Sequence, residues 1–402
     1  MQYKNKPLPD LSADPGICCG CTACMTVCPV NAITMQTDDN GFLRPVIAEE
    51  KCLRCGKCLG ACAFKKDSET TDTHLPLHAY AVRSKDTNVV TNSSSGGAFT
   101  AISDWILRRQ GAIASAVYDY ASHTLRYRLY TDESTRNEAR GSKYIHPILG
   151  DIYDICLRWM KENPEKPLLF VGTGCHVAGF HEVLNSANMR QQAILVDLIC
   201  HGTPSPKLWT EYVQYLEKTH QGKAEYVSFK DKRNGWENPY AFVRIAGREI
   251  PLDSYSYWFY ESFSQRESCF RCPYTKLPRT ADLTIGDFWG VNVSLPDFYS
   301  SAGNSLVFVQ TLKGDDLFDK IKKTIDFEEI PFSVCMQPRL ENPGKPNVRQ
   351  KQFWHDYQKN GVPYLIKHYQ EDGKIKVFSK KVIRKGKRLL RKIVDYTKRN
   401  ML

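Results

Sequence analysis

Short apolar segments alternate with longer amphipathic segments from residue 78 onwards. Residues 168–171 and 193–199 have the length and composition of buried strands, and each is followed by a glycine-containing turn. Helical patterns then run over residues 176–184 and 206–218. Strand, turn and helix repeated in this order are typical of an α/β domain with parallel strands. The pattern therefore predicts a larger α/β domain over residues 78–340.

The first 66 residues follow a different pattern. Two apolar segments, 32–35 and 42–46, flank the turn sequence Asp-Asp-Asn-Gly at positions 38–41, which predicts a β-hairpin. Polar residues rich in threonine and acids follow at positions 67–77, and we interpret them as a linker. Together with the cysteines described next, the hairpin favours an α+β ferredoxin-like N-terminal module over residues 8–66.

Nine of the fifteen cysteines lie from Cys18 to Cys62, and eight of them form two runs with the spacing C-x2-C-x2-C-x3-C. In this pattern three cysteines wrap one 4Fe-4S cluster and the fourth ligates the other cluster. The predicted ligands of cluster I are Cys18, Cys21, Cys24 and Cys62. The predicted ligands of cluster II are Cys52, Cys55, Cys58 and Cys28. The alternative is a pair of zinc sites, but zinc does not require two four-cysteine runs with these gaps.

Two other cysteines have simpler interpretations. Cys19 falls outside the repeated spacing, and we expect it to be a spare thiol rather than a ligand. Cys156 lies with Ile152 on the apolar face of a helical pattern over residues 151–162, and we expect it in the core.

Four cysteines in the larger domain form a candidate third ligand set. Cys175 and Cys200 each follow a predicted strand, and parallel strands bring their carboxyl ends to one edge of the sheet, where α/β proteins bind ligands. Cys175 also lies at a predicted helix N-terminus, which favours a thiolate. Cys269 and Cys272 add a C-x2-C pair. The alternative is that these are buried core cysteines, a common role for this residue type.

A serine- and glycine-rich loop precedes the amphipathic helix that follows residue 97. Small residues before a helix leave backbone N–H groups free to hold a phosphate, although many such segments are plain loops. The loop consists of Ser94, Ser95, Gly96 and Gly97. Lys143, in the segment Gly-Ser-Lys-Tyr at 141–144, adds a cation that could contact a phosphate or a flavin ring.

Six motifs in order resemble the beta subunit family of coenzyme F-420 hydrogenase/dehydrogenase, a family of deazaflavin-reducing flavoproteins. They lie at residues 94–97, 141–144, 172–175, 197–204, 269–272 and 282–290. The resemblance covers roughly residues 10–300 and is closest to the branch found beside polysaccharide-biosynthesis enzymes. It implies FAD near the serine-glycine loop and near Gly172 and Thr173, and it implies a third 4Fe-4S cluster. The chain departs from the family at Gly174 and His176, which flank Cys175.

The resemblance implies an oxidoreductase in which electrons pass from the ferredoxin clusters through a third cluster to FAD and an organic acceptor, or in reverse. Lys143, His176 and Asp287 are the candidate proton donors, because their motifs should face the cofactor. The partners implied are a redox donor protein or ferredoxin and an acceptor related to glycans, and an oligomer is compatible with the sequence. The rival hypothesis is an electron carrier that holds clusters without flavin.

Residues 341–402 are expected to form a C-terminal extension, and the net charge of +11 is concentrated in its basic tail. Twelve lysines and arginines and a single acid lie between residues 374 and 402, so the rest of the chain is neutral, which argues against nucleic-acid binding. Apolar residues interleave with these cations, as in a helix at a membrane interface, although a solvated basic end is the alternative. The polar N-terminal residues and the lack of a long apolar segment predict a reducing, cytoplasmic location, with peripheral membrane contact through this basic tail.

Overall fold

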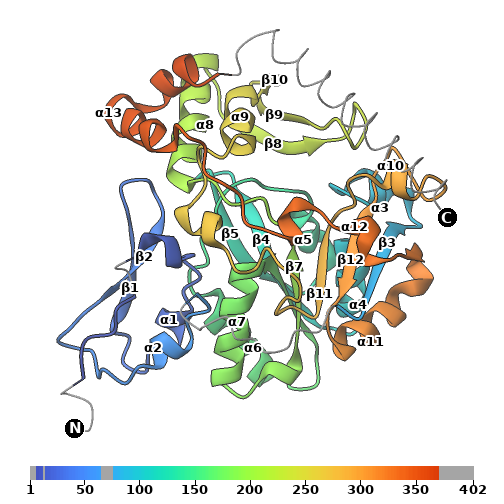
Figure 1. The fold of residues 1–402 in the computed structure, drawn as a ribbon, viewed down its shortest axis with the longest axis horizontal. Helices are drawn as coiled ribbons and strands as arrows, with labels where there is room; N and C mark the ends of the chain where they lie inside the picture. Colours follow the sequence, from blue (N-terminus) through green and yellow to red (C-terminus); the bar gives the residue numbers. More distant parts are fainter. Residues whose placement is uncertain (1–5, 12–13, 65–75, 371–402) are drawn as a thin grey trace, which may run out of the picture.

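The computed structural model describes residues 6–11, 14–64 and 76–370, drawn in colour in Figure 1. Most of the predicted linker and all of the basic tail therefore lie outside the described residues. The N-terminal module (blue in Figure 1) lies beside α6 and α7 of the larger domain.

The N-terminal module contains the predicted hairpin. Its strands pair antiparallel, with Ile33 opposite Ile47, and the Asp38 carboxylate accepts hydrogen bonds from the backbone of the turn, at 2.8 Å from Phe42 N. Gly41 has a φ of +88°, a conformation that favours glycine. The elements are η1 (Pro15–Ile17), α1 (Ala23–Thr26), β1 (Ile33–Thr37), β2 (Leu43–Ile47) and α2 (Lys57–Gly60). The structure confirms the hairpin prediction.

An eight-stranded mixed sheet forms the centre of the larger domain, in the order β13-β3-β12-β11-β7-β6-β4-β5. The neighbours β4, β6, β7 and β11 run parallel, and the other pairs run antiparallel. The strands are β3 (His78–Ser84), β4 (Ala112–Asp119), β5 (Thr124–Tyr130), β6 (Leu168–Thr173), β7 (Ala193–Leu198), β11 (Leu283–Asp287), β12 (Ser305–Val309) and β13 (Ile325–Glu329).

Helices cover both faces of this sheet. Alternate residues of β6 enter opposite cores: Phe170 packs with α6 and α7, whereas Leu169 packs with α4 and α11. The helices are α3 (Thr87–Thr91), α4 (Ala98–Leu107), α5 (Glu133–Arg136), α6 (Ile152–Glu162), α7 (Gly174–Ser186) and α11 (Leu312–Ile321). Cys156 of α6 is fully buried, as predicted for a core residue.

The two predicted strand–turn–helix units are present and adjacent. β6 and β7 are parallel neighbours, with Gly172 opposite Asp197, so the turns after them meet at one edge of the sheet. The first helix, α7, begins at Gly174, and the second, α8, covers Pro206–His220. This edge is where the candidate site is built.

A smaller three-stranded sheet packs with α8 over one end of the molecule (Figure 1). Its strands are β8 (Ala224–Asp231), β9 (Tyr240–Ile245) and β10 (Arg248–Pro251). Helices α9 (Asp253–Tyr260) and α13 (Gln350–His368) share its aromatic core. Helix α13 falls in the expected C-terminal extension at 341–402, and it packs with the larger domain. Two short helices, α10 (Val291–Ser294) and α12 (Phe332–Cys335), lie near the other end of the sheet. In the described ranges no helix combines the length and the hydropathy needed to cross a bilayer.

Candidate functional site

The eight repeat cysteines of the N-terminal module surround two separate small cavities. The first is lined by Cys18, Cys21, Cys24 and Cys62. The second is lined by Cys28, Cys52, Cys55 and Cys58. These groups are the two ligand sets expected from the spacing, including the exchange of the fourth cysteine between the runs. Among the described residues, no group of three or more His, Cys, Asp or Glu side chains is arranged around a single metal ion.

Glycines and positive-φ residues shape the loops around these cavities. Gly20 and Gly56 have φ values of +70° and +77°, and Thr22, before α1, also lies in the left-handed region. Backbone N–H groups donate to the sulfurs, at 3.3 Å from Ala32 N to Cys28 Sγ and 3.4 Å from Arg54 N to Cys52 Sγ. Such bonds stabilise a thiolate and the negative charge of a bound cluster.

The four cysteines of the candidate third set also come together. Cys175 lies in the first turn of α7, Cys200 follows β7, and Cys269 lies in the 3-10 helix η4 (Glu267–Arg271), next to Cys272. Burial, followed by the nearby Cys175 and Cys269 sulfurs, raises the pKa of the Cys272 thiol. Burial and then Cys269 and Cys175 raise the pKa of Cys200 to about 12. Cys200 and Cys272 therefore lie close enough to Cys175 and Cys269 for their charges to interact.

Hydrogen-bond donors face three of these sulfurs. The Gly202 backbone N–H donates to Cys200 Sγ at 3.3 Å, and the Thr203 backbone N–H donates to Cys269 Sγ at 3.4 Å. The Thr173 hydroxyl lies 3.4 Å from Cys175 Sγ. Four thiols with such donors are the chemistry that an iron–sulfur cluster requires.

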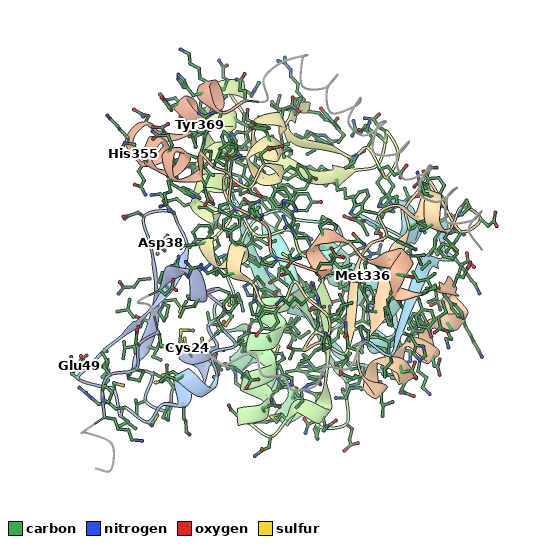
Figure 2. All side chains as sticks on the ribbon, viewed as in Figure 1. Cys24, Asp38, Glu49, Met336, His355 and Tyr369 are labelled. Carbon is green, nitrogen blue, oxygen red and sulfur yellow. The ribbon has the colours of Figure 1, made fainter. Side chains whose placement is uncertain are left out.

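The segment that carries Cys269 and Cys272 also holds the N-terminal module in place. Arg266 is fully buried and donates to the carbonyl oxygens of Cys18 and Leu43, at 2.7 Å each. Tyr274 Oη donates to the Ala63 carbonyl at 2.8 Å. In Figure 2, Cys24 lies on the side of the module that faces the larger domain, whereas Glu49 lies on the far side. Cys24, a member of the predicted cluster I set, therefore faces the larger domain.

A cavity of about 580 Å³ opens at the carboxyl ends of the parallel strands, in the range of small-molecule sites. Among the predicted site residues, those that line it are Ser94, Ser95, Gly97, Lys143, Gly172, Thr173, Asp287 and Cys200. Cys200 thus belongs both to the third cysteine set and to the wall of the cavity.

Of the residues predicted to bind FAD or to donate a proton, Gly96 and His176 do not line this cavity. A Cβ at Gly96 would lie 2.4 Å from the Val82 carbonyl oxygen, so this glycine permits close packing against β3. His176 is fully buried, and its ring packs edge-on against His146 and Tyr127. Burial lowers the pKa of His176 to about 3, which keeps it neutral.

Lys143 extends into the cavity wall from the loop after α5. Its Nζ donates to the carbonyl oxygens of Ala139, Arg140 and Gly141, at 2.9, 2.8 and 3.1 Å. Burial lowers the pKa of Lys143 to about 7. Carbonyl oxygens orient the ammonium group without neutralising it, so Lys143 gives this wall a positive charge below about pH 7.

Asp287 lies opposite, at the end of β11. Its carboxylate forms an ion pair with Lys230, at 2.6 Å, and accepts a hydrogen bond from Trp236 Nε1, at 3.0 Å. The Trp236 ring stacks on Trp289, which also lines the cavity. Burial lowers the pKa of Lys230, and Asp287 opposes that shift. The pair is thus fixed in place beside an aromatic surface.

Sequence reasoning missed three further residues that line the cavity. Arg140 and Arg339 each have a buried Nε, and His201 a buried Nε2, without a hydrogen-bond partner in the described part of the chain. Burial lowers the pKa of His201 to about 4. Arg140 directly precedes the motif at 141–144 and could have been included with it, whereas nothing in the local sequence marks Arg339.

A second, open cavity of about 1,090 Å³ adjoins the first and shares its Ser94 and Lys143 wall. Lys232 also lines it, and its Nζ, like that of Lys143, is held by carbonyl oxygens, among them Ala302 O at 2.6 Å. Two ammonium groups therefore flank the serine-glycine loop, which favours an anionic ligand at this junction.

The other acids of the motifs are structural. Asp197 forms a buried ion pair with Arg279, at 3.1 Å, and burial raises its pKa. Asp282 accepts hydrogen bonds from Arg190 and from the Leu195 backbone, at 2.8 Å each, and so ties β11 to β7. These two aspartates therefore stabilise the strands at this edge of the sheet.

Comparison with known proteins agrees with this division of the chain. Residues 17–66 match the 4Fe-4S dicluster domain family, and residues 165–333 match the family described as the C terminus of the coenzyme F420 hydrogenase/dehydrogenase beta subunit. An uncharacterized protein from Methanocaldococcus jannaschii is 27% identical over 213 residues, which are 46% of this chain and 57% of that protein. The chain thus matches little more than half of the length of this relative.

Among solved structures, a chain of the F420-reducing [NiFe] hydrogenase complex from Methanosarcina barkeri, determined as a xenon derivative, is similar. The identity is 16%, with 73% of this chain and 91% of that chain covered and a TM-score of 0.44. The two family matches carry the assignment. The chain thus carries a 4Fe-4S dicluster domain at residues 17–66 and, at residues 165–333, a region similar to the C terminus of the coenzyme F420 hydrogenase/dehydrogenase beta subunit.

Proposed function

We propose that this protein is an iron–sulfur flavoprotein oxidoreductase that exchanges electrons between its ferredoxin clusters and an organic acceptor through a third 4Fe-4S cluster and FAD. The observation that carries the proposal is the double role of Cys200, which joins the third cysteine set to the large cavity. A cluster ligand in the wall of a cofactor cavity places one-electron chemistry next to the cofactor.

The third cluster would be held by Cys175, Cys200, Cys269 and Cys272. The mutual charge effects among these thiols, the backbone donors to Cys200 and Cys269, and the hydroxyl beside Cys175 fit a cluster better than a set of unrelated core cysteines. Cys156 illustrates the contrast, since burial alone raises its pKa.

FAD fits the cavity on three grounds. The walls are largely apolar and aromatic, as a flavin ring requires. The serine-glycine loop and the cations Arg140 and Lys143 lie at the junction with the open cavity and would hold the phosphates. The buried, unpartnered Nε of Arg140 gains a partner when an anion binds there.

The chemistry supplied by the bound groups is complementary, because clusters carry single electrons and a flavin converts between one- and two-electron steps. The chain itself must position the acceptor, exclude water and move protons. Asp287 is the best placed of the three candidate proton donors, since it lines the cavity and the Lys230 ammonium group paired with it can supply the proton. Lys143 serves the anionic cofactor, and His176 lies behind the cavity wall.

The acceptor and location follow from the sequence resemblance and the charge pattern. We propose a glycan-related acceptor in polysaccharide biosynthesis, with the basic residues 374–402 contacting an anionic membrane surface. The physiological donor would be a redox protein or ferredoxin that docks near the N-terminal module.

Anaerobic purification with iron, sulfide and flavin quantified tests the proposal. Three clusters predict about twelve irons per chain, together with one noncovalent FAD. About eight irons and no affinity for micromolar FAD would favour the carrier without flavin. Stoichiometric zinc with little iron would contradict both hypotheses.

A further inference from the structure

Cys19 lies between two cysteine sets that belong to different parts of the chain. Its side chain is buried, with 5% exposed, and lines the cluster I cavity. The thiol is also within hydrogen-bonding reach of Cys21 and of Cys175. Cys21 belongs to the cluster I set of the N-terminal module, whereas Cys175 belongs to the third set of the larger domain.

The surrounding contacts fix Cys19 in this position. The His176 imidazole reaches the backbone of Cys19, and Arg266 holds the carbonyl of the preceding residue, Cys18, at 2.7 Å. A Cβ at Gly179 of α7 would lie 2.8 Å from Cys21 Sγ, so the helix can approach the cluster I loop only because this residue is glycine. The packing of α7 against the cluster I loop therefore brings the cluster I set and the third cysteine set close together.

We propose that Cys19 is a positioning residue whose thiol bridges Cys21 and Cys175 and so couples cluster I to the third cluster. This inference rests on the proposed function. One electron leaves the reduced centre ligated by Cys21 and one electron arrives at the oxidised centre ligated by Cys175. Cys19 keeps its S–H bond and is not itself oxidised or reduced.

The bridge has two effects. A sulfur between the ligand sulfurs replaces part of the gap that an electron must cross. Its S–H group, as a donor to a ligand sulfur, also stabilises the reduced, more negative state of the centre that it faces. The thiol has one proton and can donate to one of the two sulfurs at a time.

The test compares Cys19→Ala and Cys19→Ser with the wild-type protein, each purified anaerobically as the full chain. Cys156→Ala is the matched control, because this cysteine is also fully buried but has no sulfur neighbour that shifts its pKa. The measurements are iron content, redox titration of the cluster spectra by electron paramagnetic resonance, and the rate of intramolecular electron transfer.

All variants are expected to keep the wild-type iron content of about twelve per chain. Cys19→Ala should disfavour reduction of cluster I or the third cluster by about tenfold, the effect of losing one hydrogen bond to a charged group, and should slow transfer between them. A tenfold change corresponds to about 59 mV for one electron. Cys19→Ser retains a donor and should shift the potential less, and Cys156→Ala should shift nothing.

Unchanged potentials and rates in Cys19→Ala would overturn the bridging role, and so would the loss of about four irons, which would make Cys19 a ligand. If Cys19→Ala does not fold, Cys19→Ser decides by the same criteria, with a slowed rate at full iron content as the expected result. Wild-type protein with about eight irons would refute the third cluster and, with it, the bridge. This outcome differs from a failure of the bridge alone, because it is already visible in the iron content of the wild type.

Discussion

Cys200 belongs both to the third cysteine set and to the wall of the large cavity. Replacing Cys200 or Cys272 with serine should remove roughly four irons, because each serves a single cluster, and should leave the ferredoxin spectrum intact. Iron analysis and low-temperature spectra measure both effects. Full iron content in both variants would contradict the third ligand set, and Cys335→Ala, which replaces a buried cysteine outside all three sets, provides the control.

Lys143 predicts a pH dependence of FAD binding. Burial lowers its pKa to about 7 in the free protein, and phosphates beside the ammonium group would raise that pKa in the complex. At pH values between the pKa of Lys143 in the free protein and its pKa in the complex, FAD binding is accompanied by uptake of one proton by Lys143. The dissociation constant for FAD should therefore be constant below about pH 7 and increase by up to about tenfold per pH unit above it.

Equilibrium titration of flavin-free protein over a range of pH values measures this effect. Lys143→Met should bind FAD more weakly below pH 7 and lose the pH dependence. Lys313→Met is the control, since its Nζ is likewise held by three carbonyl oxygens but lies outside both cavities. The same pH profile in Lys143→Met as in the wild type would show that Lys143 does not face the bound anion.

At the residue scale, spacing and motif order carry the information about which predicted site residues share a cavity. The eight repeat cysteines follow from spacing, and the serine-glycine loop and Lys143 follow from motifs that the fold brings to one cavity. Cys19 falls outside the repeated spacing, so the sequence predicts a spare thiol, and no local pattern indicates that it lies near Cys175. Arg339 enters the cavity from a segment that has no local signal.

At the element scale, the β1–β2 hairpin joins the N-terminal module to the larger domain. Its turn lies against the start of α8, where Ser205 Oγ donates to the Asn40 carbonyl, and α13 reaches the same turn through Gln358. A Cβ at Gly41 would lie 2.2 Å from Lys207 Cβ, and Gly41 also has a positive φ. The turn can therefore dock only with glycine at this position.

Gly41→Ala should destabilise the protein by more than the about 1–2 kcal/mol that a positive φ costs an alanine. Gly235→Ala provides the matched control, because Gly235 has nearly the same φ, +87°, and nothing within 4 Å of its added Cβ. The difference between their thermal unfolding midpoints isolates the docking contact. Equal midpoints would show that the hairpin turn contributes nothing to docking.

Local patterns predicted the elements well but could not predict all of their pairings. The units at β6 and β7 follow from apolar runs that end in glycine turns, and the structure confirms both. The order of the sheet has no such signal, since β11 adds beside β7, and β12 then pairs with β3 from more than 200 residues earlier. These pairings depend on the tertiary packing of both cores.

At the scale of the whole molecule, the basic residues 374–402 predict reversible membrane binding. Each lysine or arginine near an anionic surface contributes about 1 kcal/mol, so half of the cations would suffice. The full chain should sediment with anionic liposomes at low salt and be released at high salt, whereas a version ending at Gly373 should stay in solution. Equal sedimentation of the two proteins would leave the tail as a solubilising or partner-binding extension.

In the proposed function, electrons reach the flavin through the clusters. The most direct measurement is stopped-flow bleaching of the flavin band by a reduced low-potential donor, in the wild type and in a variant whose cluster I cysteines Cys18 and Cys24 are replaced with serine. Cys24 of the predicted cluster I set faces the larger domain, and Cys200 lines the cavity. The flavin band of the wild type should therefore bleach rapidly and that of the variant slowly. Equal bleaching rates in the two proteins would contradict this route.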